Sequence, residues 1–251
     1  MDQKACQNCL QMLWDMAWKT IENQPGLGAI VEGEIDAISK RNPETMTANV
    51  FLHEYTWSVF GVGISIQKVL EPRWAGIRRA FGDFDISYIV NSPETVLSQI
   101  VAPGVRVLNV SRKAKSVIVM ACEIQNRGWD AVKADLLHGH STNQSGMFIP
   151  SNYAIQYLDD FPQVGTTVAK YILKNVGFDI DKDDLHLKRY ACHLGYPDSQ
   201  EGVHEMCADI ALVVKSTVRE VDTVLWNASA KADRGTLRFD CPQCYLHFEL
   251  L

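Results

Sequence analysis

The chain has 251 residues, of which 47% are hydrophobic and 22% are charged, and its formal net charge is -6. This length can bury a substantial core, as one domain or as two closely associated lobes. We find no apolar run near the roughly 20 residues of a membrane-spanning helix and no signal-peptide order at the N-terminus, so we expect a cytoplasmic protein without a membrane role. The acidic balance argues against nucleic-acid binding unless the basic residues cluster.

Apolar residues recur at helical spacing along most of the chain, and no segment shows a convincing strand alternation. Pro and Gly break this pattern at 25–28 and 101–104, and 133–147 is predicted to be a polar loop after a brief helix. The sequence therefore predicts an all-α fold, with a loop over 228–240 and helices over 1–24, 30–39, 47–70, 74–81, 85–90, 93–100, 114–125, 152–160, 166–176, 185–194, 205–217 and 216–227.

The most informative stretch is residues 161–189. It opens with the sequence FPQVG at 161–165, which predicts a tight turn because Pro fixes one backbone angle and Gly reaches angles that other residues avoid. The helix predicted over 166–176 follows at once, and Gly177 caps its end. Such a turn presents backbone N–H groups at a helix N-terminus, where the dipole favours a phosphate. The turn alone is also typical of an ordinary corner between two helices.

An acidic loop and a second helix follow this turn at a distance that resembles a known family. The helix-hairpin-helix DNA glycosylases, the superfamily of endonuclease III and 8-oxoguanine glycosylase, carry a Leu-Pro-Gly-Val-Gly hairpin, a helix, then Val-Asp-x-His and an Arg. The matches here are FPQVG, then Asp184-Leu185-His186 and Arg189. Residues 51–84 resemble the family's middle helical domain, and 221–226 resemble its closing helix.

The resemblance covers most of the chain, with 155–195 matched residue by residue. It implies one glycosylase module over 1–251, built from two helical lobes with a cleft between them and the hairpin at its mouth. The expected division is a middle lobe over 46–150 and a second lobe, formed by 1–45 with 151–251, that carries the helix-hairpin-helix at 152–177.

The resemblance makes Asp184 the candidate catalytic residue. Breaking an N-glycosidic bond leaves positive charge on the sugar, which a nearby carboxylate stabilises while it deprotonates an attacking water. Asp184 also stands directly before an apolar helix, which is typical of an N-cap residue, and the two roles are compatible. We expect the neighbouring Asp181 and Asp183 to be solvated.

Two positions depart from the family pattern. Gln163 replaces the middle Gly of the hairpin, and Thr167 stands where the lyase-active members carry a catalytic Lys. Because Thr has no amine to form a Schiff base, we expect a monofunctional hydrolase that uses water and leaves an abasic site. The substrate is expected to be duplex DNA, in the cytoplasm at the nucleoid. The base could be a repair lesion or a modified base of foreign DNA.

Several other residues are candidates for holding DNA or the flipped base. Base recognition needs an aromatic or apolar platform and polar groups on the base edge, although aromatic residues on helices more often belong to the core and His186 more often orients its loop. Among the basic residues outside the motif, Arg112, Lys113 and Lys115 are expected to face solvent, and Lys170 is expected to face solvent or phosphate. The candidate DNA contacts are Gln163, Val164, Gly165, Thr166, Thr167, Lys188 and Arg189, and the candidate pocket residues are Glu54, Trp57, Gln67 and His186.

Two CxxC pairs stand at the ends of the chain, Cys6 with Cys9 and Cys241 with Cys244. Each pair can place two sulfurs on one ion, and four thiolates suit zinc or an iron–sulfur cluster. Endonuclease III relatives hold [4Fe–4S] through closely spaced cysteines, a different pattern, while related 3-methyladenine glycosylases join their ends through zinc, so zinc is preferred. Coincidental spacing is the alternative. The other cysteines, Cys122, Cys192 and Cys207, are predicted to be core thiols, and no organic cofactor is expected.

The sequence thus favours a monomeric DNA glycosylase, with two rivals. One is a non-catalytic module that holds DNA through the hairpin, and the other is a metal-tied helical protein without a nucleic-acid role. An Asp184 that lies in a pocket open to the hairpin favours the enzyme, whereas a buried and salt-bridged Asp184 favours binding only.

Overall fold

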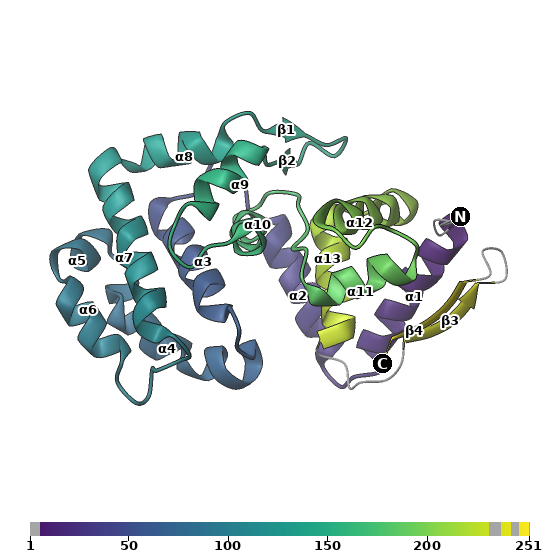
Figure 1. Ribbon diagram of the computed structural model, residues 1–251, viewed down its shortest axis with the longest axis horizontal. Coiled ribbons are helices and arrows are strands. Elements are labelled where there is room, and N and C mark those ends of the chain that lie inside the picture. The colour runs from purple at the N-terminus through teal and green to yellow at the C-terminus, as the bar shows by residue number, and fades with distance from the viewer. Residues whose placement is uncertain (1–5, 231–236, 242–245, 251) are drawn as a thin grey trace. The chain divides into compact units, whose positions relative to one another are not determined.

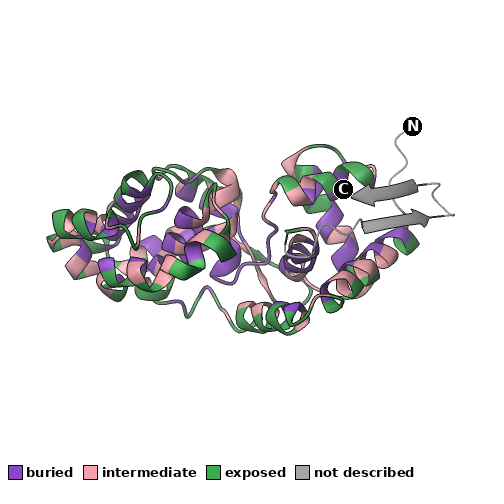
Figure 2. Cartoon of the chain, turned by 90° about the horizontal axis from the view of Figure 1, so that it is seen from below, coloured by how far each residue is buried: buried purple, intermediate pink, exposed green. Residues whose placement is uncertain are grey.

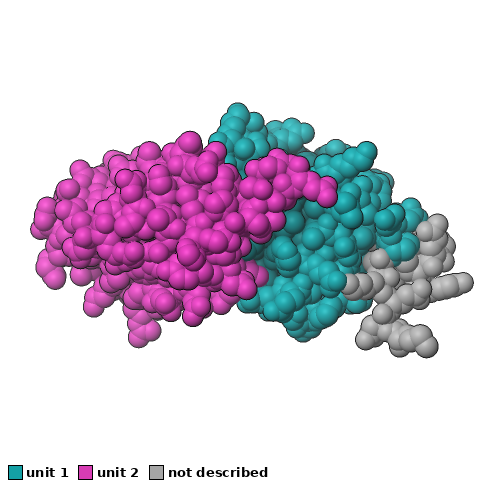
Figure 3. Space-filling view, turned by 90° about the horizontal axis from the view of Figure 1, so that it is seen from above, with its two compact units in different colours: residues 1–41, 179–251 teal, residues 42–178 magenta. Residues whose placement is uncertain are grey.

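The computed structural model describes residues 6–230 and the backbone of 237–241 and 246–250. The chain forms two compact units, which Figure 3 colours separately. Unit 1 is Met1–Arg41 together with Asp179–Leu251, and unit 2 is Asn42–Phe178. In each unit the buried residues lie along the inward faces of amphipathic helices and the exposed residues along their outward faces (Figure 2).

Unit 2 consists mainly of helices (Figure 1). Its only strands among the described residues, β1 (Ser141–Thr142) and β2 (Phe148–Ile149), pair antiparallel. Its helices are α3 (Ala48–Gly61), the π-helix η1 (Ile66–Leu70), α4 (Glu71–Ala80), the 3-10 helix η2 (Gly82–Phe84), α5 (Ile86–Asn91), α6 (Pro93–Ile100), α7 (Val110–Arg127), α8 (Trp129–Leu137), α9 (Asn152–Asp159) and α10 (Thr166–Asn175).

Helix α7 is the centre of unit 2, since it packs against α3, α5, α6 and α8. Its buried face carries Ala114, Val117, Ala121 and Ile124 at helical spacing. A buried hydrogen bond of 2.8 Å joins Tyr55 of α3 to Ser116 of α7, so the polar groups of this core are paired as burial requires. Burial also raises the pKa of the Tyr55 phenol above its ordinary value.

The predicted solvent-facing basic cluster at the start of α7 is only partly correct. Arg112 and Lys115 are exposed, but Lys113 is buried. Its ammonium nitrogen Nζ donates to the carbonyl oxygens of Phe60 at 2.9 Å and Val62 at 2.7 Å. These carbonyls lie at the end of α3, where backbone acceptors have no partner within the helix. Lys113 is therefore a buried cap for the C-terminal end of α3. Burial also lowers its pKa to about 8.

The helix-hairpin-helix belongs to unit 2. The boundary between the units falls after Phe178, whereas the sequence placed 152–177 with the terminal segments. The difference arises because α9 packs against α8, and α10 packs against both α9 and α3. The hairpin therefore shares the core of the middle helices, a tertiary preference that local sequence does not reveal.

Unit 1 combines the two ends of the chain. Its core brings residues of α1 such as Leu13 and Ile21 against residues of α12 and α13 such as Ile210 and Leu225. The two strands pair antiparallel, and β3 lies against α1. The elements of unit 1 are α1 (Gln7–Glu22), α2 (Leu27–Ser39), α11 (Leu185–His193), α12 (Gln200–Val214), α13 (Val218–Ala230), β3 (Leu237–Cys241) and β4 (Leu246–Leu250).

The predicted all-α fold class is confirmed, with local differences. The two short antiparallel ribbons are additions that the sequence did not predict. The loop predicted over 228–240 is wrong at both ends, because α13 continues through Ala230 and β3 begins at Leu237. Within the described residues, no helix combines the length and the apolar character that crossing a membrane requires.

The hairpin keeps a left-handed residue at the position where the family carries glycine. Gln163 has a φ of 65° and an exposed side chain. A non-glycine residue in this region costs about 1–2 kcal/mol, and glycine gives back about 0.5–1 kcal/mol in backbone entropy. We therefore expect Gln163→Gly to raise the free energy of unfolding by about 0.5–1 kcal/mol in urea denaturation. Gln163→Ala is the matched control, and an equal gain from Ala would exclude backbone strain as the cause.

Candidate functional site

The hairpin between α9 and α10 is a tight, internally bonded turn. The backbone N–H of Val164 donates to the carbonyl of Phe161 at 3.1 Å, and Gly165 is the extended N-cap residue of α10. No side chain of the described residues caps this helix, so its first-turn N–H groups are available to an anion. The hydroxyl of Thr166 donates to Asp159 at 3.2 Å, and Val164 is buried. The side chains of these two residues are therefore already hydrogen-bonded or buried.

Asp184 is the N-cap residue of α11, as its sequence position predicted. One carboxylate oxygen, Oδ1, accepts the backbone N–H of His186 at 3.0 Å and that of Leu187 at 3.3 Å. The backbone at Asp184 is extended, with φ of -84° and ψ of 176°, which lets the side chain fold back over the first turn. The side chain is 15% exposed, and the cap uses only one of its two oxygens.

That second oxygen, Oδ2, lies 3.3 Å from the ammonium nitrogen of Lys182. Lys182 is itself held in place. Its backbone N–H donates to the buried carboxylate of Asp222 on α13 at 2.9 Å, and its ammonium lies 5.4 Å from the centre of the Trp226 ring, within the range of a cation–π contact. The sequence analysis did not single out Lys182. It placed Asp222 and Trp226 in the predicted closing helix, where their four-residue step puts both on one face.

The acidic loop before Asp184 is buried, so the prediction that Asp181 and Asp183 are solvated is wrong. The reason is that the loop packs against α12 and α13. Asp181 pairs with His204 of α12 at 2.7 Å. Asp179 accepts the backbone N–H of Arg219, the second residue of α13, at 3.0 Å. Burial lowers the pKa of the Arg219 guanidinium, and nearby Asp179 acts in the opposite direction.

His186 links α11 to α13 rather than standing free. Its ring nitrogen Nδ1 lies 2.8 Å from the hydroxyl oxygen of Ser229, and its ring meets that of Trp226 edge-on, with the two centres 6.5 Å apart. This geometry supports the reading of His186 as an orienting residue, while its role in a base pocket stays a prediction. Lys188 is half-buried and Arg189 is exposed on the same helix.

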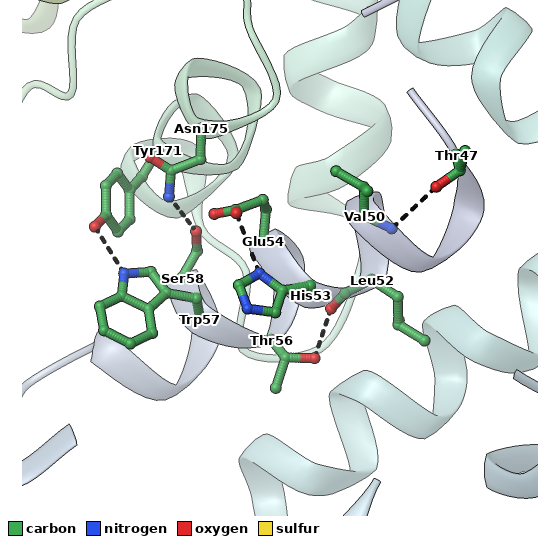
Figure 4. A network of polar contacts seen from close by, with 10 residues as sticks. All are labelled: Thr47, Val50, Leu52, His53, Glu54, Thr56, Trp57, Ser58, Tyr171 and Asn175. Atoms are coloured by element: carbon green, nitrogen blue, oxygen red, sulfur yellow. Dashed lines mark hydrogen bonds and ion pairs between the residues drawn. The ribbon is translucent and has the colours of Figure 1, made fainter. Parts of the chain in front are cut away.

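Glu54 and Trp57 belong to a polar network between α3 and α10 (Figure 4). Glu54 is buried, and its carboxylate lies 3.1 Å from the ring nitrogen Nδ1 of His53. The indole N–H of Trp57 donates to the hydroxyl of Tyr171 at 3.2 Å. Figure 4 shows both contacts on the side of α3 that faces α10. A carboxylate and an aromatic ring are thus gathered on one helix, as base recognition would require.

The predicted pocket residues do not all lie in this network. Gln67 is exposed on η1, and His186 belongs to unit 1 whereas α3 belongs to unit 2. Lys170, which was expected to face solvent or phosphate, is buried on α10, because this short helix packs on both α9 and α3. The pocket assignment therefore stays a prediction.

The N-terminal cysteine pair is close enough to share an ion. The sulfur atoms of Cys6 and Cys9 are 3.6 Å apart. The side chain of Cys241 and all of Cys244 lie outside the described residues. Within the described part of the chain, no group of three or more His, Cys, Asp or Glu is arranged to hold a metal ion. Cys207 is buried as predicted, but Cys192 is exposed on α11, so the prediction that Cys192 is a core thiol is wrong.

Comparison with solved structures tests the fold that the resemblance implied. The resemblance read from the sequence is therefore confirmed at the level of the fold. No family model matches the chain, and no curated protein sequence matches it either.

Two solved structures from Methanocaldococcus jannaschii are similar to this chain. One is an 8-oxoguanine glycosylase/lyase in complex with 15mer DNA containing 8-oxoguanine, with a TM-score of 0.57 and 17% identity over 84% of this chain and 96% of that chain. The other is an 8-oxoguanine DNA glycosylase, with a TM-score of 0.59 and 15% identity over 89% of this chain and 94% of that chain. At these identities the likeness shows the fold.

The capping role of Asp184 can be separated from any chemistry. Asp184→Ala removes the cap, so we expect it to lower the free energy of unfolding by about 1 kcal/mol, whereas Asp184→Asn keeps a good cap and should cost less than about 0.5 kcal/mol. Urea denaturation measures both. The control is Asp130→Ala, whose side chain is 96% exposed and whose loss should stay within about 0.5 kcal/mol. Equal losses for Ala and Asn would assign the stability to the ion pair instead.

Proposed function

We propose that this protein is a DNA N-glycosylase that hydrolyses the bond between the sugar and a base flipped out of duplex DNA. The observation that carries the proposal is the geometry of Asp184. Its Oδ1 is fixed by the N-terminus of α11, and its Oδ2 lies 3.3 Å from the Lys182 ammonium, in a side chain that is 15% exposed. The fold shared with two 8-oxoguanine glycosylases supports this role.

The chemistry needs one carboxylate at the anomeric carbon. As the base departs, positive charge develops on the sugar, and a carboxylate about 4 Å away stabilises it by roughly 4 kcal/mol at an effective dielectric of about 20. This corresponds to a rate gain of nearly a thousandfold. The base leaves with the electron pair of the broken bond. The carboxylate takes a proton from water, whose oxygen bonds to the anomeric carbon. That proton then passes to the base through solvent, so the products are the neutral free base and an abasic site, and the carboxylate is restored.

The proposed reaction is monofunctional because of the residue at position 167. Thr167 is half-buried in the first turn of α10, at the position where lyase-active members of the resembled family carry a lysine. A hydroxyl cannot form the Schiff base that precedes strand cleavage. One of the similar structures is a glycosylase/lyase, so this chain would differ from it in lacking the strand cleavage that follows base release.

The substrate class proposed is a damaged or modified base. The similar complex contains 8-oxoguanine, so 8-oxoguanine belongs in the first panel of bases, together with alkylated purines, mismatches and modified pyrimidines. A repair lesion and a modified base of foreign DNA are both consistent with the residues described.

A second candidate function has one observation in its favour. Asp184 is salt-bridged to Lys182 and 15% exposed, which is closer to the arrangement expected of a non-catalytic module than an unpaired carboxylate would be. Such a module would hold DNA through the hairpin without releasing a base.

Base release separates the two candidates. Wild type and Asp184→Asn are incubated with duplexes that carry the panel of bases, and free bases are identified by mass spectrometry. We expect the wild type to release one class of base and Asp184→Asn to do so about 10²- to 10³-fold more slowly, because the charge that stabilises the transition state is lost. Asp130→Asn removes an exposed carboxylate and should release the base at the wild-type rate.

Two results would count against the proposal. No release from any duplex, with DNA binding intact in both proteins, would favour the binding module. A covalent adduct captured by borohydride with the wild type would contradict the monofunctional mechanism, since only an imine between the protein and the sugar can be trapped in this way.

The terminal cysteines are proposed to hold one structural zinc ion. Zinc–sulfur bonds of about 2.3 Å in a tetrahedral site separate two thiolates by about 3.8 Å, and the sulfurs of Cys6 and Cys9 are 3.6 Å apart. Strand β3, which ends at Cys241, packs against α1, the helix that follows Cys6. The spacing of the first pair supports Cys6, Cys9, Cys241 and Cys244 as the ligand set. Cys9 is disulfide-bonded in the structure, so zinc binding would require its reduction to a thiolate, and the ion would then tie the ends of the chain together.

Elemental analysis tests this site. Purified protein is expected to contain about one zinc per chain, and Cys6→Ser is expected to lose most of it, because removing one of four thiolates weakens a closed site strongly. Cys192→Ser changes an exposed thiol on α11 and should keep the zinc. Iron with a matching amount of acid-labile sulfide would replace the zinc assignment with a cluster, and a metal-free wild type would remove the site.

A further inference from the structure

The ammonium of Lys182 lies beside the carboxylate oxygen of Asp184 that the helix cap does not use. Oδ1 accepts two backbone N–H groups, at 3.0 Å and 3.3 Å. Oδ2 is 3.3 Å from the Lys182 nitrogen. The two oxygens therefore have different partners, and rotation of the carboxylate is opposed at both.

Lys182 is built into the fold more firmly than a surface lysine. Its backbone is bonded to the buried carboxylate of Asp222, its ammonium lies over Trp226, and its side chain is only 21% exposed. A lysine normally loses up to about 2 kcal/mol of side-chain entropy when one geometry is imposed on it. Here the backbone anchor and the aromatic face limit the stem before the ion pair forms, so less of that entropy remains to be lost.

Several other polar and charged groups of unit 1 near the pair have hydrogen-bond partners of their own. Asp181 pairs with His204, and Asp222 accepts the Lys182 N–H. His186 lies against Ser229. Lys182 is thus the cation that the structure sets against the Asp184 side chain among the described residues.

We propose that Lys182 is a positioning residue for Asp184, which it holds as an oriented carboxylate with Oδ2 fixed for the sugar and the attacking water. This inference rests on the glycosylase proposed above. A misplacement of about 1 Å at a reacting group can cost about 100-fold in rate, and a functional group keeps its geometry only if its neighbours lock it. Lys182 acts through Asp184 and forms no bond with the DNA.

The test compares Lys182→Met, Lys182→Arg and Lys19→Met. Met keeps the length of the stem without the charge, and Arg keeps the charge. Lys19 is an exposed lysine of α1, so its replacement makes the same change in net charge elsewhere in the unit. The measurements are the single-turnover rate of base release and the dissociation constant for substrate DNA.

We expect Lys182→Met to slow base release at least about tenfold while DNA affinity changes less than about threefold, since the lost interaction serves the transition state more than binding. Lys182→Arg should recover the rate to within about threefold of wild type, and Lys19→Met should not differ from it. A merely structural role would not separate rate from affinity or be rescued by Arg.

Three results would overturn the proposal. Lys182→Met could release the base at the wild-type rate, or Arg could fail as completely as Met. A borohydride adduct that forms with the wild type and disappears in Lys182→Met would make Lys182 the nucleophile instead.

A wild type that releases no base would refute the glycosylase itself, and a separate measurement then decides what the pair does. The unfolding equilibria of Lys182→Met, Asp184→Asn and the double variant form a cycle. If the wild type releases no base and the unfolding equilibrium constants depart from additivity by about two- to fivefold, the ion pair stabilises the fold and has no catalytic role. Additive effects would remove the interaction altogether.

Discussion

The segment that leads from the end of α10 to the start of α11 has to find hydrogen-bond partners for its backbone outside any helix or strand. Residues 178–184 lie in neither, and buried N–H groups that lack a partner are costly. Carboxylates supply the partners. Asp222 accepts the N–H of Lys182, and Asp179 in turn accepts the N–H of Arg219. The loop and the N-terminal part of α13 are therefore hydrogen-bonded to each other in both directions. These bonds fix the backbone directly before Asp184.

The same arrangement explains why so many acidic residues can be buried in one place. Burying a lone carboxylate in an apolar interior is prohibitively expensive, and only hydrogen bonds and opposite charges make it tolerable. Asp179 bonds to the start of a helix, where the macrodipole favours a negative charge. Asp181 has His204 as its partner. Removal of one partner from such a network costs more than the pair contributes, so the loop is expected to be rigid, which suits a segment that carries a reactive group.

Much of this could be predicted from the sequence because the signals are local. The helical periods, the FPQVG turn and the aspartate before an apolar helix depend on residues close together in the chain. The turn and the cap lie where they were expected, and so do most of the helices, although a break at 62–65 divides the helix predicted over 47–70. Gln163 is instructive, since the hairpin keeps its left-handed backbone there without glycine. The geometry is thus imposed by the packing of α9 and α10 rather than by the residue at the turn.

The features that could not be predicted depend on contacts between distant segments. Lys113 looked like a surface lysine, and only the end of α3, some fifty positions away, makes it a buried cap. Asp181 and Asp183 looked solvated because nothing nearby in sequence covers them, yet α12 and α13 do. Lys182 lies two residues from Asp184, but its importance depends on Asp222 and Trp226. The two residues of the pair are close in sequence, but the contacts that anchor Lys182 depend on the fold.

A salt-bridged carboxylate and a catalytic carboxylate are compatible when the energies are compared. An ion pair that is 15–21% exposed at its side chains has a strength near the upper end of the range for exposed pairs, about 1 kcal/mol. A carboxylate about 4 Å from a developing sugar cation contributes roughly 4 kcal/mol. The ammonium can therefore give up part of its contact with Oδ2 as the cation forms, and the net change still favours the transition state. The helix cap is untouched by this exchange because it uses the other oxygen, so Asp184 can keep α11 in place throughout the reaction.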